Sequence, residues 1–153
     1  MAALYFEDVE VGATFAVGRR IVTESDLQQF AAISGDHHPI HTDDDFARKT
    51  PFGRRIAHGP FGIAIAIGLF GEIEEFQASS LAMVDVRDWS FRAPIYIGDE
   101  LSLRFTVVGK RLTRSGKGIV DRQLVLLKSD GTVAQEGFSG LLIATRSQAS
   151  KAS

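Results

Sequence analysis

Cysteine is absent from the 153 residues, and the sequence also has little net charge and no long apolar run. The first absence excludes disulfides, thiolate metal ligands and cysteine nucleophiles. A formal net charge of −2 argues against a protein that binds nucleic acid through bulk positive charge. The longest apolar run, residues 60–70, is too short to cross a bilayer. The sequence does not show the basic segment followed by an apolar stretch that is typical of a signal peptide. We therefore expect a cytoplasmic protein without membrane partners.

The overall composition is that of an ordinary globular protein. The hydrophobic fraction is 44% and the charged fraction 24%, and the length suits one domain with a substantial core. We therefore expect a single domain over residues 1–146. Residues 147–153 are small and polar, which predicts a disordered tail.

Helix signals dominate the first half, after one expected strand at residues 13–22, where apolar side chains alternate. Two helix starts follow, Thr23 and Thr42, each a threonine with an aspartate three residues later. The first helix should end at Gly35, a common terminator. The second should be short, because Pro51 and its neighbours break it.

A third helix is expected from His58 to Phe70. Gly59 and Pro60 suit its first positions, and every face of the run that follows is apolar. The β-branched isoleucines make a buried strand the competing interpretation, but the Gly-Pro start and the length favour a helix. A helix without a polar face should be buried all round, and a curved sheet could enclose it.

The second half is rich in strand patterns. Apolar and polar residues alternate most clearly at 101–107, and a Ser-Asp-Gly turn at 129–131 joins the last two strands. Expected strands cover residues 81–91, 101–107, 119–127 and 132–145. Helices followed by antiparallel strands define an α+β domain.

All four histidines lie between residues 37 and 58, and three of them follow Asp36 in a loop between two predicted helices. Histidine exchanges protons most readily near neutral pH. Gly35 frees the backbone before Asp36, and Pro39 favours an extended His38. The chain should therefore turn so that Asp36 and His41 converge on one water or substrate, as an acid–base pair.

Other interpretations of these residues stay open. Asp36 could merely close a turn, and His58 could be a structural histidine bonded to backbone. A metal site is disfavoured, because Pro39 prevents a regular helix that would space His38 and His41 as ligands. The basic run 110–117 is typical of a solvated hairpin, although it could instead meet phosphates, as could Arg54 and Arg55.

Gly59 supplies a second candidate feature. The N-terminus of a helix offers N–H groups without intrahelical acceptors and a partial positive charge. Glycine there allows another molecule to approach the backbone closely. Such a donor would stabilise a developing oxyanion.

The segment Ser-Gly-Asp-His-His-Pro-Ile-His at 34–41, then Asp43 and the Ile-Ala-His-Gly of 56–59, resembles the signature of the MaoC-like, R-specific enoyl-CoA hydratase family. The resemblance continues through residues 89–100, with their Gly-Asp turn. It implies the hot-dog fold, in which a curved antiparallel sheet wraps a long central helix. It also implies a homodimer, or a dimer of dimers, with an acyl-CoA tunnel near the subunit boundary.

The resemblance implies an activity as well. Asp36 and His41 would hold and deprotonate a water and return a proton to C2, while the Gly59 N–H would hold the thioester oxygen. Water would add to a trans-2-enoyl thioester, giving an R-3-hydroxyacyl thioester, or the reverse. A CoA thioester would be substrate, and neither a metal nor another cofactor is expected. The residues expected to contact substrate are His38, Ala57, His58 and Phe61.

One position departs from the family pattern, since His38 stands where asparagine is usual. That asparagine supports the catalytic residues, so the change bears on orientation or pKa and on the choice of substrate. Two other functions remain possible at this point. The chain could be an acyl-CoA thioesterase or a non-catalytic subunit that binds acyl thioesters.

Overall fold

A six-stranded antiparallel sheet forms the body of the molecule in the computed structural model, which describes residues 2–152. The strand order is β1-β4-β5-β6-β2, and β3 also pairs with β6. Its strands are β1 (Thr14–Ile21), β2 (Ser80–Met83), β3 (Arg87–Phe91), β4 (Glu100–Leu112), β5 (Gly118–Lys128) and β6 (Val133–Ile143). The predicted α+β class is confirmed, and the helix–strand ambiguity at residues 60–70 is resolved in favour of a helix.

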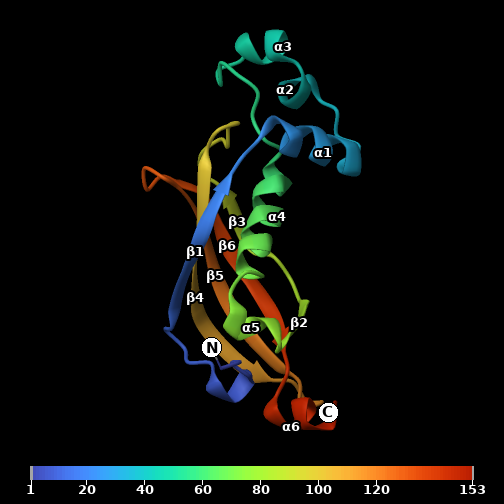
Figure 1. Ribbon diagram of the computed structural model, residues 1–153, viewed down its shortest axis with the longest axis vertical. Helices are drawn as coiled ribbons and strands as arrows, with labels where there is room; N and C mark the ends of the chain where they lie inside the picture. The colour runs from blue at the N-terminus through green and yellow to red at the C-terminus, as the bar shows by residue number, and fades with distance from the viewer. Residues whose placement is uncertain (1, 153) are drawn as a thin grey trace.

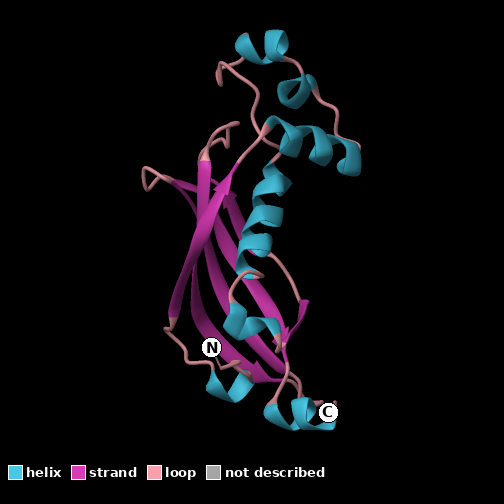
Figure 2. Cartoon of the chain, in the orientation of Figure 1, coloured by secondary structure: helices cyan, strands magenta, loops and turns pink. Residues whose placement is uncertain are grey.

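That helix, α4 (Gly59–Phe70), runs along the concave face of the sheet (Figures 1 and 2). Ala66 and Phe70 are buried in the core, where Phe70 packs against Phe105 of β4. The prediction that α4 is buried all round is wrong for the single chain. Ala64 and Gly68 are exposed, because the sheet covers only one side of the helix.

Three short helices extend beyond the sheet at the N-terminal end of α4 (Figure 1). They are α1 (Glu24–Ser34), α2 (Pro39–Thr42) and α3 (Asp44–Arg48). The predicted cap of α1 is confirmed, since Thr23 accepts a hydrogen bond from the backbone of Asp26 and Gly35 ends the helix with φ 77°. The predicted start of the next helix at Thr42 is one residue early, because the Asp43 carboxylate caps α3.

The expected single strand over residues 81–91 is wrong in detail, because it forms two strands along the same edge of β6. Ser80–Met83 pairs with the end of β6 and Arg87–Phe91 with its middle. Between them, the Asp85 carboxylate accepts a hydrogen bond from Gly140 N–H of β6, and within β3 Asp88 takes a left-handed φ of 49°, where the register shifts. Because a side chain takes the place of a backbone acceptor here, the ladder of hydrogen bonds between the strands is interrupted.

The expected disordered tail is also wrong for most of its length. Helix α6 (Arg146–Lys151) follows β6, and Thr145 caps it in a reciprocal pair of hydrogen bonds with Gln148. Ser153 lies outside the described residues. Two further short helices, η1 (Phe6–Asp8) and α5 (Glu74–Gln77), complete the described elements. Among the described helices, none has the length and apolar character needed to cross a membrane.

Candidate active site

Asp36 follows α1 directly and projects its carboxylate beside α2. The left-handed Gly35 turns the chain out of α1, and the backbone N–H of His38 then donates to Asp36 Oδ1 at 3.1 Å. This hydrogen bond is the main cause that lowers the pKa of Asp36 below its ordinary value of 3.8. The carboxylate, half exposed at 53%, is therefore ionised at neutral pH.

His41 lies in the last turn of α2 with its ring largely buried. Nδ1 lies 2.7 Å from the carbonyl oxygen of Ile56. A carbonyl oxygen only accepts, so Nδ1 carries the hydrogen and Nε2 keeps its lone pair. Burial lowers the pKa of His41 below 6.5, against the opposing effects of the Ile56 hydrogen bond and the Asp36 charge. The ring is thus held neutral, with a basic nitrogen available.

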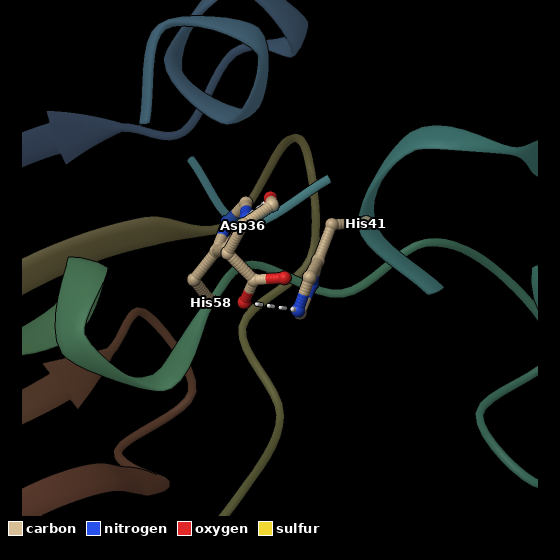
Figure 3. A group of neighbouring side chains, drawn as sticks. All are labelled: Asp36, His41 and His58. Carbon is tan, nitrogen blue, oxygen red and sulfur yellow. Dashed lines mark hydrogen bonds and ion pairs between the residues drawn. The ribbon is translucent and has the colours of Figure 1, made fainter. Parts of the chain in front are cut away.

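The basic nitrogen of His41 faces the Asp36 carboxylate (Figure 3). Nε2 and Oδ2 are 3.8 Å apart, too far for a direct hydrogen bond. In the tautomer that the Ile56 bond favours, both atoms are acceptors. A water donating one hydrogen to each would separate its acceptors by about 4.4 Å, given ordinary hydrogen-bond lengths. The observed 3.8 Å is somewhat shorter than this, so a shared water fits after a small rotation of the half-exposed Asp36 side chain. The oxygen of such a water would keep its lone pairs free.

His58 joins this pair to α4 (Figure 3). It is the N-cap residue of α4, only 2% exposed, and its Nε2 donates to the backbone carbonyl of Asp36 at 2.9 Å. Its ring stacks on that of His41 with centroids 3.8 Å apart, and the ring of Phe30 packs against it in a tilted arrangement. His58 therefore positions both members of the pair, as expected of a structural histidine.

Asp36, His41 and His58 are also the described residues whose ligand atoms lie close enough to hold a metal, within 4.8 Å of one another. The two imidazoles are stacked with an interplanar angle of only 23°. Lone pairs lie in the ring planes, so those of two stacked rings point along nearly parallel planes instead of toward one ion. This geometry fits zinc poorly, because zinc must lie about 2.0–2.1 Å from each nitrogen along its lone pair.

A hollow of about 330 Å³ adjoins His41 of the pair. Ala57, Gly59, Phe91 and Gln135 are among the other residues that line it. Gly59 is the first residue of α4, so its N–H is among those without an intrahelical acceptor. An imidazole base and a backbone donor at a helix N-terminus thus border one partly apolar hollow.

Gln135 is a site residue that the sequence did not predict. Its side chain, 3% exposed, accepts a hydrogen bond from Trp89 Nε1 and donates to the Gly59 carbonyl, each at 3.0 Å. It lies in the space that a Cβ on Gly62 would occupy, 2.2 Å away. A glutamine within an apolar strand was the available signal, because buried amides need partners.

The other predicted residues lie in different places. Ala57 borders the hollow, whereas Phe61 packs against Phe30 on another side of α4 and does not border it. His38 is exposed, and its Nδ1 accepts from the N–H of Ile40 as the N-cap of α2. The oxygen of an asparagine at this position could accept the same bond.

The basic groups considered for phosphate binding lie in different parts of the molecule. The run 110–117 lies at the opposite end of the sheet, where Lys110 Nζ donates to the carbonyl of Phe6. Arg55 forms ion pairs with two carboxylates, those of Glu24 at the start of α1 and Asp44 at the start of α3. Arg54 instead lies over the ring of Tyr96, near the hollow.

Comparison with known proteins identifies the family of the chain. The model of the MaoC like domain matches residues 9–126, and the chain belongs to the MaoC-like family. A 3-hydroxybutyryl-CoA dehydratase of Methylorubrum extorquens is 36% identical over 107 residues, 70% of this chain and 66% of the relative's length. An (R)-specific enoyl-CoA hydratase of Rhodospirillum rubrum is 33% identical over 105 residues, 69% and 70% of the two chains.

Solved structures agree on the fold. A MaoC-like dehydratase from Rhodospirillum rubrum superposes with a TM-score of 0.83 at 28% identity, covering 94% of this chain and 99% of that one. A Mycobacterium tuberculosis protein described as a double hotdog fold gives 0.79 at 18% identity, over 94% and 44%. The predicted hot-dog fold is confirmed. The chain is thus a hot-dog protein similar to hydratases and dehydratases of acyl thioesters.

Proposed function

We propose that this protein is a hydratase or dehydratase that adds water to a trans-2-enoyl thioester of CoA, giving an R-3-hydroxyacyl thioester, or catalyses the reverse reaction. The observation that supports this proposal most directly is the 3.8 Å spacing of Asp36 Oδ2 and His41 Nε2 beside the hollow that Gly59 borders. The names of the similar dehydratase and hydratase support CoA as carrier and the R configuration.

In the hydration direction, the substrate would lie in the hollow with its thioester oxygen at the Gly59 N–H. Water held by Asp36 and His41 would attack C3, and one of its protons would pass to His41 Nε2. The π electrons of the alkene would move toward the thioester oxygen, giving an enolate that the backbone donor stabilises. Return of a proton to C2 would complete the addition, so that the elements of water are conserved and no co-reactant is needed.

The experiment is an absorbance assay for loss of the enoyl thioester across acyl chain lengths, with a thiol-trapping reagent in parallel. We expect loss of the conjugated enoyl absorbance without free CoA. Release of CoA from acyl-CoA would instead support a thioesterase. Absence of turnover across the whole panel, with acyl-CoA still bound, would favour a non-catalytic binding subunit.

We further propose that the active unit is a homodimer. Among the described strands, β2 and β3 have β6 on one side only, so their other backbone edge is available for pairing. Apolar side chains of this edge are exposed, including Leu81 at 58% and Phe91 at 57%. The uncovered side of α4, with Ala64 and Gly68, adds a further apolar surface. A second copy would cover both and supply the burial that an all-apolar helix requires.

A further inference from the structure

A second cavity lies at the C-terminal end of α4, far from the catalytic pair. It has a volume of about 340 Å³, and apolar side chains from α4, α5 and β2 form most of its walls. Ile67, Phe70 and Leu141 are among them. Three polar residues also border it: Gln77 of α5, which donates to the Gly71 carbonyl, Ser80 of β2 and Arg122 of β5. A charged group in a largely apolar cavity calls for an explanation.

Arg122 is 1% exposed, and its guanidinium lies 4.5 Å over the ring of Phe70. Nε and Nη2 donate to the carbonyl and hydroxyl oxygens of Ser139, so the described bonds use two of five N–H donors. No carboxylate of the described residues forms an ion pair with it. Asp85 acts on Arg122 only at longer range and is itself paired with Arg87.

Burial lowers the pKa of Arg122 to about 10, so the group stays charged at neutral pH. A buried cation without a counter-ion is costly unless something else stabilises it. The hydroxyl of Ser80 in the same cavity is likewise buried and has no hydrogen-bond partner. A guanidinium and a hydroxyl with unused donors form a suitable pair for one anionic oxygen group.

Residues at a spacing of four along α4 run from the catalytic end to this cavity. Gly59 borders the first hollow, Ile67 and Phe70 border the second cavity, and half-buried Ile63 lies between them at the helical spacing of four. Eight residues of helix separate Gly59 from Ile67, a rise of about 12 Å. An extended chain advances about 1.2 Å per bond, so roughly ten bonds would bridge the two.

We infer that Arg122, with Ser80, binds a carboxylate carried at the end of an apolar chain. The source that the helix geometry favours is the terminal carboxyl of the substrate's own acyl group, so that the enzyme acts on enoyl thioesters of dicarboxylic acids. This source rests on the proposed function. A free fatty acid in the cavity has the same chemistry, and the experiment distinguishes the two.

The kinetic arm compares 2-enoyl-CoA substrates of eight to twelve carbons that end in a carboxylate with matched substrates that end in a methyl group. In the wild-type protein we expect kcat/KM to favour the carboxylate series by at least about tenfold. Arg122→Met should abolish this preference, and Arg122→Lys should retain part of it. Because the preference is a ratio within one variant, partial loss of folded protein cancels.

The binding arm measures decanoate by titration calorimetry. Decanoate that binds the wild type but not Arg122→Met, without a kinetic preference, would identify a free carboxylate as the ligand. Arg104→Met, which removes an exposed arginine of β4, should leave both measurements unchanged. If the wild type shows no preference and binds no decanoate, the carboxylate site is refuted. Turnover of the methyl-ended series tests the hydratase proposal separately, so the two can fail independently.

Discussion

At the scale of the residue, the acid–base pair has a clear test. Asp36→Asn removes the negative charge and replaces one acceptor oxygen by a donor, His41→Ala removes the basic nitrogen, and we expect kcat to fall by about 10²–10⁴ in each. KM should change little, because neither group is needed to hold the thioester. His37→Ala is a matched control, since this exposed histidine lies in the same loop outside the cluster. Full activity in both catalytic variants would refute the assignment.

The environment of His41 sets the pH dependence. Burial lowers its pKa below 6.5, so its base form persists to lower pH than that of a free histidine. We expect kcat/KM to be flat through neutral pH and to fall on an acid limb with a midpoint below 6.5. The free energy of unfolding depends on pH in the same direction. The contribution of neutral His41 to stability is present above pH 6.5 and is lost as the pH falls through the lowered pKa of His41. An acid limb centred above 6.5 would contradict this environment.

His38 can be tested against the residue that is usual in the family. His38→Asn supplies an oxygen that can cap α2, and we expect activity and the free energy of unfolding to stay close to wild type. His38→Ala removes the acceptor for Ile40 N–H and should lower that free energy by about 0.5–2 kcal/mol, measured by urea unfolding. A large loss in His38→Asn would mean that the imidazole has a role beyond the cap.

At the scale of the element, Gln135 fixes the first turn of α4. Gln135→Leu removes the donor to the Gly59 carbonyl and the acceptor for Trp89, so the backbone donor at Gly59 should lose its orientation. We expect kcat to fall by about tenfold, a change in barrier of about 1.4 kcal/mol, with KM little changed. Gly62→Ala should act in the same direction, because its Cβ would displace the glutamine amide.

Gln123→Leu provides the comparison for that prediction. Gln123 lies on the neighbouring strand β5 and is half-buried, outside the hydrogen bonds of the site. Its loss should leave kcat at the wild-type value. If the Gln135 and Gln123 variants lower kcat equally, the effect belongs to the sheet as a whole, and a positioning role for Gln135 is wrong.

The elements that the sequence predicted well are those defined by local patterns. The capping pair at Thr23 and the left-handed glycine at 35 placed α1 correctly, because both signals act within one turn of helix. The interruption between β2 and β3 was missed, since it depends on the Asp85 carboxylate meeting β6, more than fifty residues away along the chain. Gln135 was missed for the same reason, because its partners come from other elements.

At the scale of the whole molecule, the proposed dimer makes a prediction. We expect a molar mass twice that of the chain by light scattering. Leu81→Lys places a charge on the exposed edge of β2 and should shift the protein toward monomer, with activity lost in parallel. Val108→Lys changes an exposed valine of β4, away from this edge, and should leave the mass unchanged. A wild-type monomer with full activity would refute the dimer.

The whole-molecule arrangement also explains why the sequence overestimated the burial of α4. An apolar pattern predicts that a helix is covered but not which chain covers it, and the single chain covers only one side of α4. The proposed second copy would cover the other side. For the tail, by contrast, the sequence predicted less structure than is observed. Its small polar residues favour disorder, but the Thr145–Gln148 capping box, a short-range signal present in the sequence, supports a helix.

His58 has a wider consequence, which concerns how the two halves of the site depend on each other. The acid–base residues come from the segment of α1 to α3, and the backbone donor comes from α4. Because His58 caps α4 yet bonds to the Asp36 backbone carbonyl and stacks on His41, we expect the ordering of the two parts to be coupled. Substrate that orders one part would lower the entropy cost of ordering the other, so binding at the thioester and alignment of the water would be cooperative.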